Sequence, residues 1–140
     1  MKTKIFYDLW EMECCGVPFK IGDTIDWLVR NIDGIKDTIE VDNLYYIYDA
    51  HNDDWENIYK LKGIVKTINI YYEKFEMKKV NGRNMLVPIP KTSKLVNTNS
   101  SNDYEKEIGE QKASAYVVEL EDVTIRPATE KEVTYSKKNI

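Results

Sequence analysis

The feature that most constrains the fold of this chain is the pattern of apolar residues along residues 62–72, which alternates and then shifts by one position. Apolar side chains recur there at every second position, which is the period of a β-strand with one buried face. The alternation slips midway, because Val65 lies on the odd positions whereas Ile68 and Ile70 lie on the even ones. Such a slip predicts a β-bulge near residues 66–67, and a bulge bends its strand. A long bent strand favours a small sheet that curls and closes.

Alternating segments elsewhere in the chain predict further strands. They cover residues 4–10, 24–30, 44–48, 73–80, 85–89 and 113–125. Asn81-Gly82 is typical of a hairpin turn, and a second parity change at Glu121-Asp122 predicts a turn or another bulge. Six or seven short strands predict an all-β, mainly antiparallel fold. We expect a small closed or partly open β-barrel, SH3-like or related, with at most one short helix.

The 140 residues predict a single domain. We expect the barrel to occupy residues 1–128, with residues 129–140 as a charged, frayed tail. Residues 11–18 are expected to connect two strands, since they contain glycine and proline. Residues 91–111 are rich in polar residues and turn formers, which predicts a mobile loop. An alternative is two helical turns between residues 101 and 111.

Charge is distributed unevenly along the chain, although the net charge is only −4. Residues 1–57 carry 13 acids and 5 bases, whereas residues 58–98 carry 2 acids and 9 bases. The basic segment suits an acidic partner or nucleic acid, or it neutralises the acidic first part within one fold. No apolar run is long enough for a transmembrane helix, and the N-terminus lacks the apolar core of a signal peptide. We therefore expect a cytoplasmic protein without membrane partners.

Cys14, Cys15 and His51 are the only cysteines and the only histidine. Thiolate and imidazole groups are ligands for zinc or copper, so these three residues form one candidate metal site, with zinc as the cofactor. Neighbouring carboxylates such as Asp49 would have to supply a fourth ligand, and adjacent cysteine side chains diverge. Two alternatives remain for the cysteines: a redox-active disulfide between neighbours, or small residues in a turn beside Gly16.

Aromatic and lysine side chains interleave on the predicted middle strands and form the second candidate site. Its proposed ligand-binding residues are Tyr46, Tyr48, Trp55, Lys62 and Tyr72. Such a surface on a small barrel stacks bases and holds phosphates in many nucleic-acid-binding modules. The alternative is that most of the tyrosines pack in the core and across strands.

The stretch from Trp10 to Trp27 reads W-x-M-x-C-C-G-x-P-F-x-x-G-D-x-I-x-W. This pattern resembles the opening signature of a family of small uncharacterised bacterial proteins, a domain of unknown function. Members of that family also have a histidine after an aromatic strand and a Gly-x-Val-x-x-Ile strand, which correspond here to His51 and residues 63–68. The resemblance implies a bacterial protein with this domain, and it implies no particular activity.

The sequence therefore predicts only a broad functional class and no particular activity. The chain shows no nucleophile with a base, no phosphate-binding glycine loop and no Gly-x-Ser-x-Gly motif. We expect a non-enzymatic binding or accessory module, with a protein partner or self-association first and nucleic acid second. The alternative is a metal- or thiol-site protein that uses Cys14, Cys15 and His51.

Overall fold

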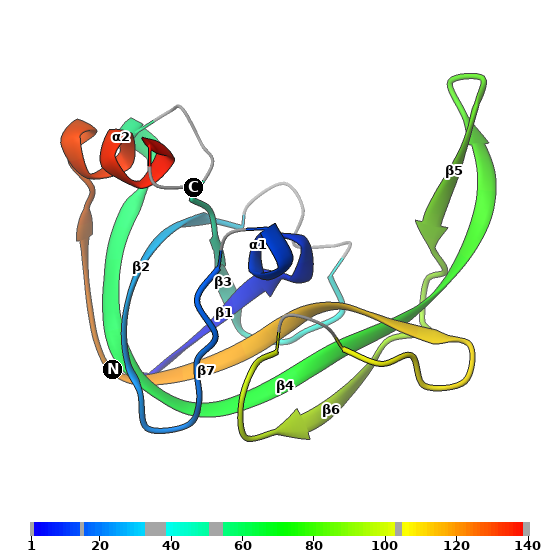
Figure 1. Ribbon diagram of the computed structural model, residues 1–140, viewed down its shortest axis with the longest axis horizontal. Coiled ribbons are helices and arrows are strands. Elements are labelled where there is room, and N and C mark those ends of the chain that lie inside the picture. Colours follow the sequence, from blue (N-terminus) through cyan, green and yellow to red (C-terminus); the bar gives the residue numbers. More distant parts are fainter. Residues whose placement is uncertain (1, 15, 33–38, 51–54, 103–104, 139–140) are drawn as a thin grey trace.

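A computed structural model shows a mostly β protein with two short α-helices (Figure 1). It describes residues 2–14, 16–32, 39–50, 55–102 and 105–138. The strands are β1 (Thr3–Asp8), β2 (Thr24–Asn31), β3 (Leu44–Tyr48), β4 (Tyr59–Val80), β5 (Arg83–Pro88), β6 (Lys94–Thr98) and β7 (Gln111–Pro127). The helices are α1 (Leu9–Cys14) and α2 (Glu130–Lys138), and η2 (Trp55–Asn57) is a turn of 3-10 helix.

Strand pairing closes a ring of hydrogen bonds. The order along the sheet is β2-β3-β1-β7-β4-β5, and β2 also pairs with β4, so five strands return to their starting point. The β1–β3 pair is parallel, and the other pairs are antiparallel. β5 and β6 pair with different parts of β4: β6 with residues 68–72, and β5 with residues 75–80. The predicted mostly β, mainly antiparallel fold is confirmed, while a resemblance to SH3 domains stays a prediction.

Two bulges lie where the alternation changes parity. The β4–β7 register shifts between Val65 and Thr67, which confirms the bulge expected from the sequence. It shifts again where Lys62 pairs with Thr124 and Ile64 with Glu121, so that β7 carries the extra residue there. Both long strands curve strongly across the molecule (Figure 1). The bulges therefore account for the bending that lets a few strands form a ring.

Apolar side chains form clusters on opposite faces of the curved sheet. On β1, Ile5 and Tyr7 belong to the largest cluster, whereas Phe6 belongs to a second one with Tyr71. A third cluster joins Leu28 of β2 to Val133 of α2. Because successive side chains of a strand point to opposite faces, one strand supports two clusters.

Two expectations from the sequence are wrong: the strand end and connection at residues 9–14, and the limit of one short helix. Residues 9–14 form helix α1, where the end of a strand and a connection were expected, and α2 raises the number of α-helices to two. The expected tail at 129–140 thus contains α2, which buries Val133. The expected loop at 91–111 contains strand β6. Its described residues 105–111 form no helix, because a turn at Gly109 brings residue 108 opposite residue 111.

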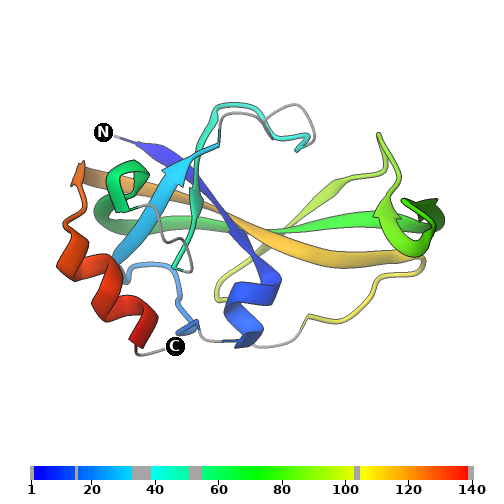
Figure 2. The same cartoon turned by 90° about the horizontal axis from the view of Figure 1, so that it is seen from above.

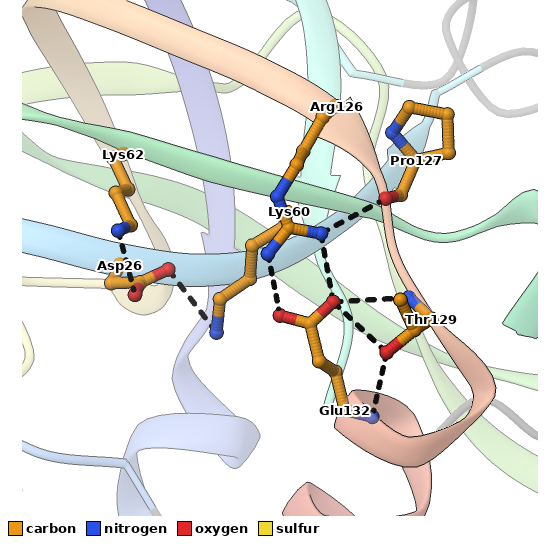
Figure 3. A network of polar contacts seen from close by, with 7 residues as sticks. All are labelled: Asp26, Lys60, Lys62, Arg126, Pro127, Thr129 and Glu132. Atoms are coloured by element: carbon orange, nitrogen blue, oxygen red, sulfur yellow. Dashed lines mark hydrogen bonds and ion pairs between the residues drawn. The ribbon is translucent and has the colours of Figure 1, made fainter.

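A capping box starts α2 (Figure 3). The Thr129 hydroxyl accepts a hydrogen bond from the Glu132 N–H at 3.2 Å, and the Glu132 carboxylate accepts one from the Thr129 N–H at 3.0 Å. Arg126 donates two hydrogen bonds of 2.8 Å to the same carboxylate. Thr-x-x-Glu is a recognised start signal for a helix, and it is present in the sequence at residues 129–132.

None of the described helices has the length and apolar character needed to cross a membrane.

Candidate ligand-binding pocket

A pocket of about 470 Å³ lies where β1 passes into α1, beside β2 and β3. It is lined by Asp8, Trp10, Glu11, Arg30, Ile47, Tyr48 and Asp49. β1 and β3 run parallel, so their carboxyl ends lie at the same edge of the sheet. β2 runs antiparallel to β3 and places Arg30 opposite Ile47. Three strands and one helix thus converge on this pocket, although their residues are far apart in sequence.

Three carboxyl groups and one guanidinium group make the pocket acidic. Arg30 Nε donates a hydrogen bond of 2.9 Å to Asp49 Oδ2, and both side chains are largely shielded from solvent. Burial raises the pKa of Asp8, which the Arg30 charge and a hydrogen bond from Trp10 partly offset. Glu11 is only 2% exposed. With all three carboxyls ionised, the pocket carries a net charge of about −2, which favours a cationic group.

Aromatic rings form one side of the same pocket. Tyr48 stacks on the buried ring of Tyr7, with 4.0 Å between the ring centroids and 15° between the planes. Burial raises the pKa of both phenols, and a hydrogen bond joins their hydroxyls, so both stay neutral at physiological pH. The Trp10 side chain lines the pocket and keeps 54% of its surface exposed. Aromatic faces attract organic cations, which matches the acidic groups beside them.

These lining groups suit an organic cation better than a metal ion. Within the described ranges, no three histidine, cysteine, aspartate or glutamate side chains converge closely enough to hold a metal. Spaced carboxylates next to aromatic faces instead fit a group with dispersed positive charge and some apolar surface. Ammonium groups on alkyl chains and guanidinium groups have these properties.

The predicted metal residues are only partly described. Cys14 is the last residue of α1, and it is disulfide-bonded in this structure. Its sulfur would have to be reduced before it served as a thiolate ligand. Cys15 and His51 lie outside the described residues. The metal site on Cys14, Cys15 and His51 therefore stays a prediction.

The predicted aromatic and lysine residues do not share one exposed surface. Tyr72 is only 3% exposed and donates a hydrogen bond of 3.0 Å to the Lys106 carbonyl oxygen. Trp55 packs against the cluster beneath α2. The ring of Tyr46 contacts that of Tyr59 at 6.4 Å between centroids. Lys62 is exposed and lies 4.0 Å from Asp26 (Figure 3).

Of that predicted set, Tyr48 alone lines the pocket. Sequence reasoning missed Asp8, Trp10, Glu11 and Arg30 as site residues. Alternation placed Asp8 and Trp10 on one face of the expected strand 4–10. The structure instead ends β1 at Asp8 and places Trp10 in α1, so the two side chains meet at the pocket because the chain turns into a helix there. Their meeting with Arg30 depends on pairing between distant strands, which alternation does not encode.

The fold and the pocket define a class: a small curved β-sheet protein with an acidic, aromatic-lined pocket at one sheet edge. Comparison with known families gives a more particular answer. The chain belongs to a family of unknown function (DUF6578), whose model matches residues 1–122. The matched range includes the pocket and all seven strands except the last residues of β7. No match was found among curated proteins or among solved structures.

Proposed function

We propose that this protein is a non-enzymatic binding module whose pocket takes an amine or guanidinium group. The observation that carries the proposal is the composition of the pocket: its lining contains three carboxylates (Asp8, Glu11 and Asp49), a single cation (Arg30) and the Trp10 ring. A small closed β-barrel, as expected from the sequence, would present such a pocket on rigid strands. Binding would add a charge-assisted hydrogen bond to Asp8 and a cation–π contact with Trp10.

The arrangement of Asp49 and Asp8 supports a positively charged ligand rather than an anion. Arg30 already donates to Asp49, so its charge is largely satisfied within the protein. The Asp8 side chain is half-buried, and burial raises its pKa although the Arg30 charge and a hydrogen bond from Trp10 partly offset this rise. A ligand cation at this position would restore the ionised form that burial disfavours.

Calorimetric titration with agmatine, which carries one amine and one guanidinium, tests the proposal. We expect saturable binding by the full chain, about tenfold weaker in an Asp8→Asn variant because a charged hydrogen bond is lost. Glu107→Gln is the matched control, since this carboxylate is exposed and does not line the pocket. The proposal fails if the full chain does not bind agmatine, or if both variants bind it equally well.

The pH dependence of agmatine affinity provides a second measurement. Because burial raises the pKa of Asp8, the carboxyl takes up a proton at a higher pH than an ordinary aspartate. Protonated Asp8 cannot attract a cation, so affinity should fall as the pH decreases through this raised pKa. Asp8→Asn should remove this contribution to the pH dependence, and an unchanged pH profile would contradict the role of Asp8.

A further inference from the structure

A two-stranded arm projects from the sheet. It consists of residues 75–88, the outer part of β4 with β5, joined by a turn in which Asn81 and Gly82 both have positive φ. β4 pairs with β7 only as far as Lys74, so beyond that residue the arm has only its own two strands. Both views show the arm standing clear of α1 and β3 (Figures 1 and 2).

Apolar side chains on this arm are unusually exposed. Met77 is 62% exposed and Leu86 is 49% exposed, and the two lie directly opposite each other across the strand pair. Met85 on the other face is 47% exposed. A hairpin without further strands is only marginally stable in water, and a group of exposed apolar side chains marks an interaction surface. Methionine adapts its shape readily, which suits a surface that packs only in a complex.

The charge of the arm is opposite to that of the rest of the protein. The arm holds Lys78, Lys79 and Arg83 against Glu76, a net charge of +2, so the remaining chain carries −6 of the total of −4. Lys78 lies 3.2 Å from Glu76. Among the described residues, no ion pair includes Arg83, which follows the turn, or Lys79, which lies one pair further from the turn on the opposite face.

We infer that this arm docks on a second copy of the same chain, with Lys79 and Arg83 reaching the acidic pocket. The inference rests on the proposed function and names the partner that supplies the basic group. Two arms packed together would place like charges side by side, whereas arm against pocket joins opposite charges. If each copy inserts its arm into the other, the assembly closes as a two-fold dimer.

Nucleic acid fits the same arm less well. The single aromatic residue of the arm, Phe75, lies at its base, so no aromatic ring on which a base would stack lies beside Lys79 and Arg83 at the tip. The remaining body is acidic and would repel phosphates. The exposed apolar pair, Met77 and Leu86, instead suits the partly apolar core of a protein interface.

Sedimentation equilibrium of the full chain tests the inference. At about 50 mM salt we expect a dimer, and at about 500 mM salt a larger share of monomer, because salt screens exposed charges. Lys79→Glu with Arg83→Glu should raise the dimer dissociation constant at least tenfold. Lys94→Glu with Lys131→Glu is the control, since it reverses the same number of charges on exposed lysines outside the arm. Met77→Ser with Leu86→Ser should also weaken the dimer without altering the charge.

Mixing two deficient variants gives the sharpest test. The Lys79→Glu, Arg83→Glu variant keeps the pocket, and Asp8→Asn keeps the arm, so a mixture should regain one of the two contacts and associate more strongly than either variant alone. A monomeric full chain, or a dimer unaffected by the arm variant, would overturn the inference. So would a monomer that binds duplex DNA through Lys79 and Arg83, which would assign the arm to nucleic acid. In each of these cases agmatine binding decides the proposed function separately.

Discussion

At the scale of one residue, the position of Gly16 after α1 leaves no room for a larger side chain. Its N–H donates a hydrogen bond of 2.9 Å to the Glu11 carbonyl oxygen and closes the helix. A Cβ atom at this position would lie 2.9 Å from the Met12 Cα and 2.5 Å from the Tyr7 hydroxyl oxygen. Tyr7 is buried against Tyr48 of the pocket, so it cannot move aside easily.

Gly16→Ala should therefore destabilise the protein by about 1–3 kcal/mol, as overpacked cores do. Urea unfolding measures the change. Val17→Ala is the neighbouring control, because Val17 is 79% exposed and should contribute little. Equal stability of the two variants would show that the close approach at Gly16 relaxes without cost.

Glu132 should make stability depend on pH in the acidic range. The Arg126 hydrogen bonds hold its pKa at about 2, against an ordinary value of 4.5. A folded-state pKa below the unfolded value stabilises the fold above pH 4.5, and this contribution is lost as the pH falls towards 2. Glu132→Gln keeps the capping geometry but lacks the charge. Its deficit in unfolding free energy should therefore be largest at neutral pH and shrink steadily below pH 4.5.

Urea titrations at several pH values between 3 and 7 would measure this deficit. Lys131→Gln is the control, because it removes a neighbouring charge that takes no part in the hydrogen bonds between Thr129, Glu132 and Arg126. A deficit for Glu132→Gln that is the same at every pH would contradict the role of Arg126.

At the scale of elements, alternation predicts strands well and pairing poorly. β3 has the predicted bounds, and the Asn81-Gly82 hairpin and the bulge beside Val65 lie where they were predicted. These features depend on local chemistry: a period of two, a turn with positive φ and a slip in parity. The parallel pairing of β1 with β3 has no local signal, and the pocket depends on it. The sequence did not predict α1, because its six residues are too few to show the 3.6-residue period of a helix.

The bulge in β7 gives a prediction for an element. Asp122 is exposed and has a φ of 54°, a left-handed conformation that aspartate tolerates and β-branched residues do not. Asp122→Val should cost about 1–2 kcal/mol or more, whereas Asp122→Gly should leave stability close to that of the original chain. Thermal unfolding of the two variants compares them directly. If valine is tolerated as well as glycine, the left-handed residue does not hold the bulge in place.

At the scale of the whole molecule, the arm is separable from the body. None of the described apolar clusters includes a residue from 75–88. At the base of the arm, the Ile89 N–H donates a hydrogen bond of 2.8 Å to the Lys74 carbonyl oxygen. Residues 74 and 89 are therefore already spaced as the ends of a two-residue hairpin turn. Most of the stability of the chain should reside in the ring of strands and in α2.

Replacing residues 75–88 with Asn-Gly tests this division of roles. The shortened chain should fold, with a melting temperature within about 5 °C of the original, since little buried area is lost. It should bind agmatine at least as tightly as the original chain, because no pocket residue belongs to the arm and no arm of a second copy competes for the pocket. It should also sediment as a monomer. A chain that fails to fold would show that the arm stabilises the body. A shortened chain that still dimerises would place the contact between copies on the body, and loss of agmatine binding would show that the pocket depends on the arm.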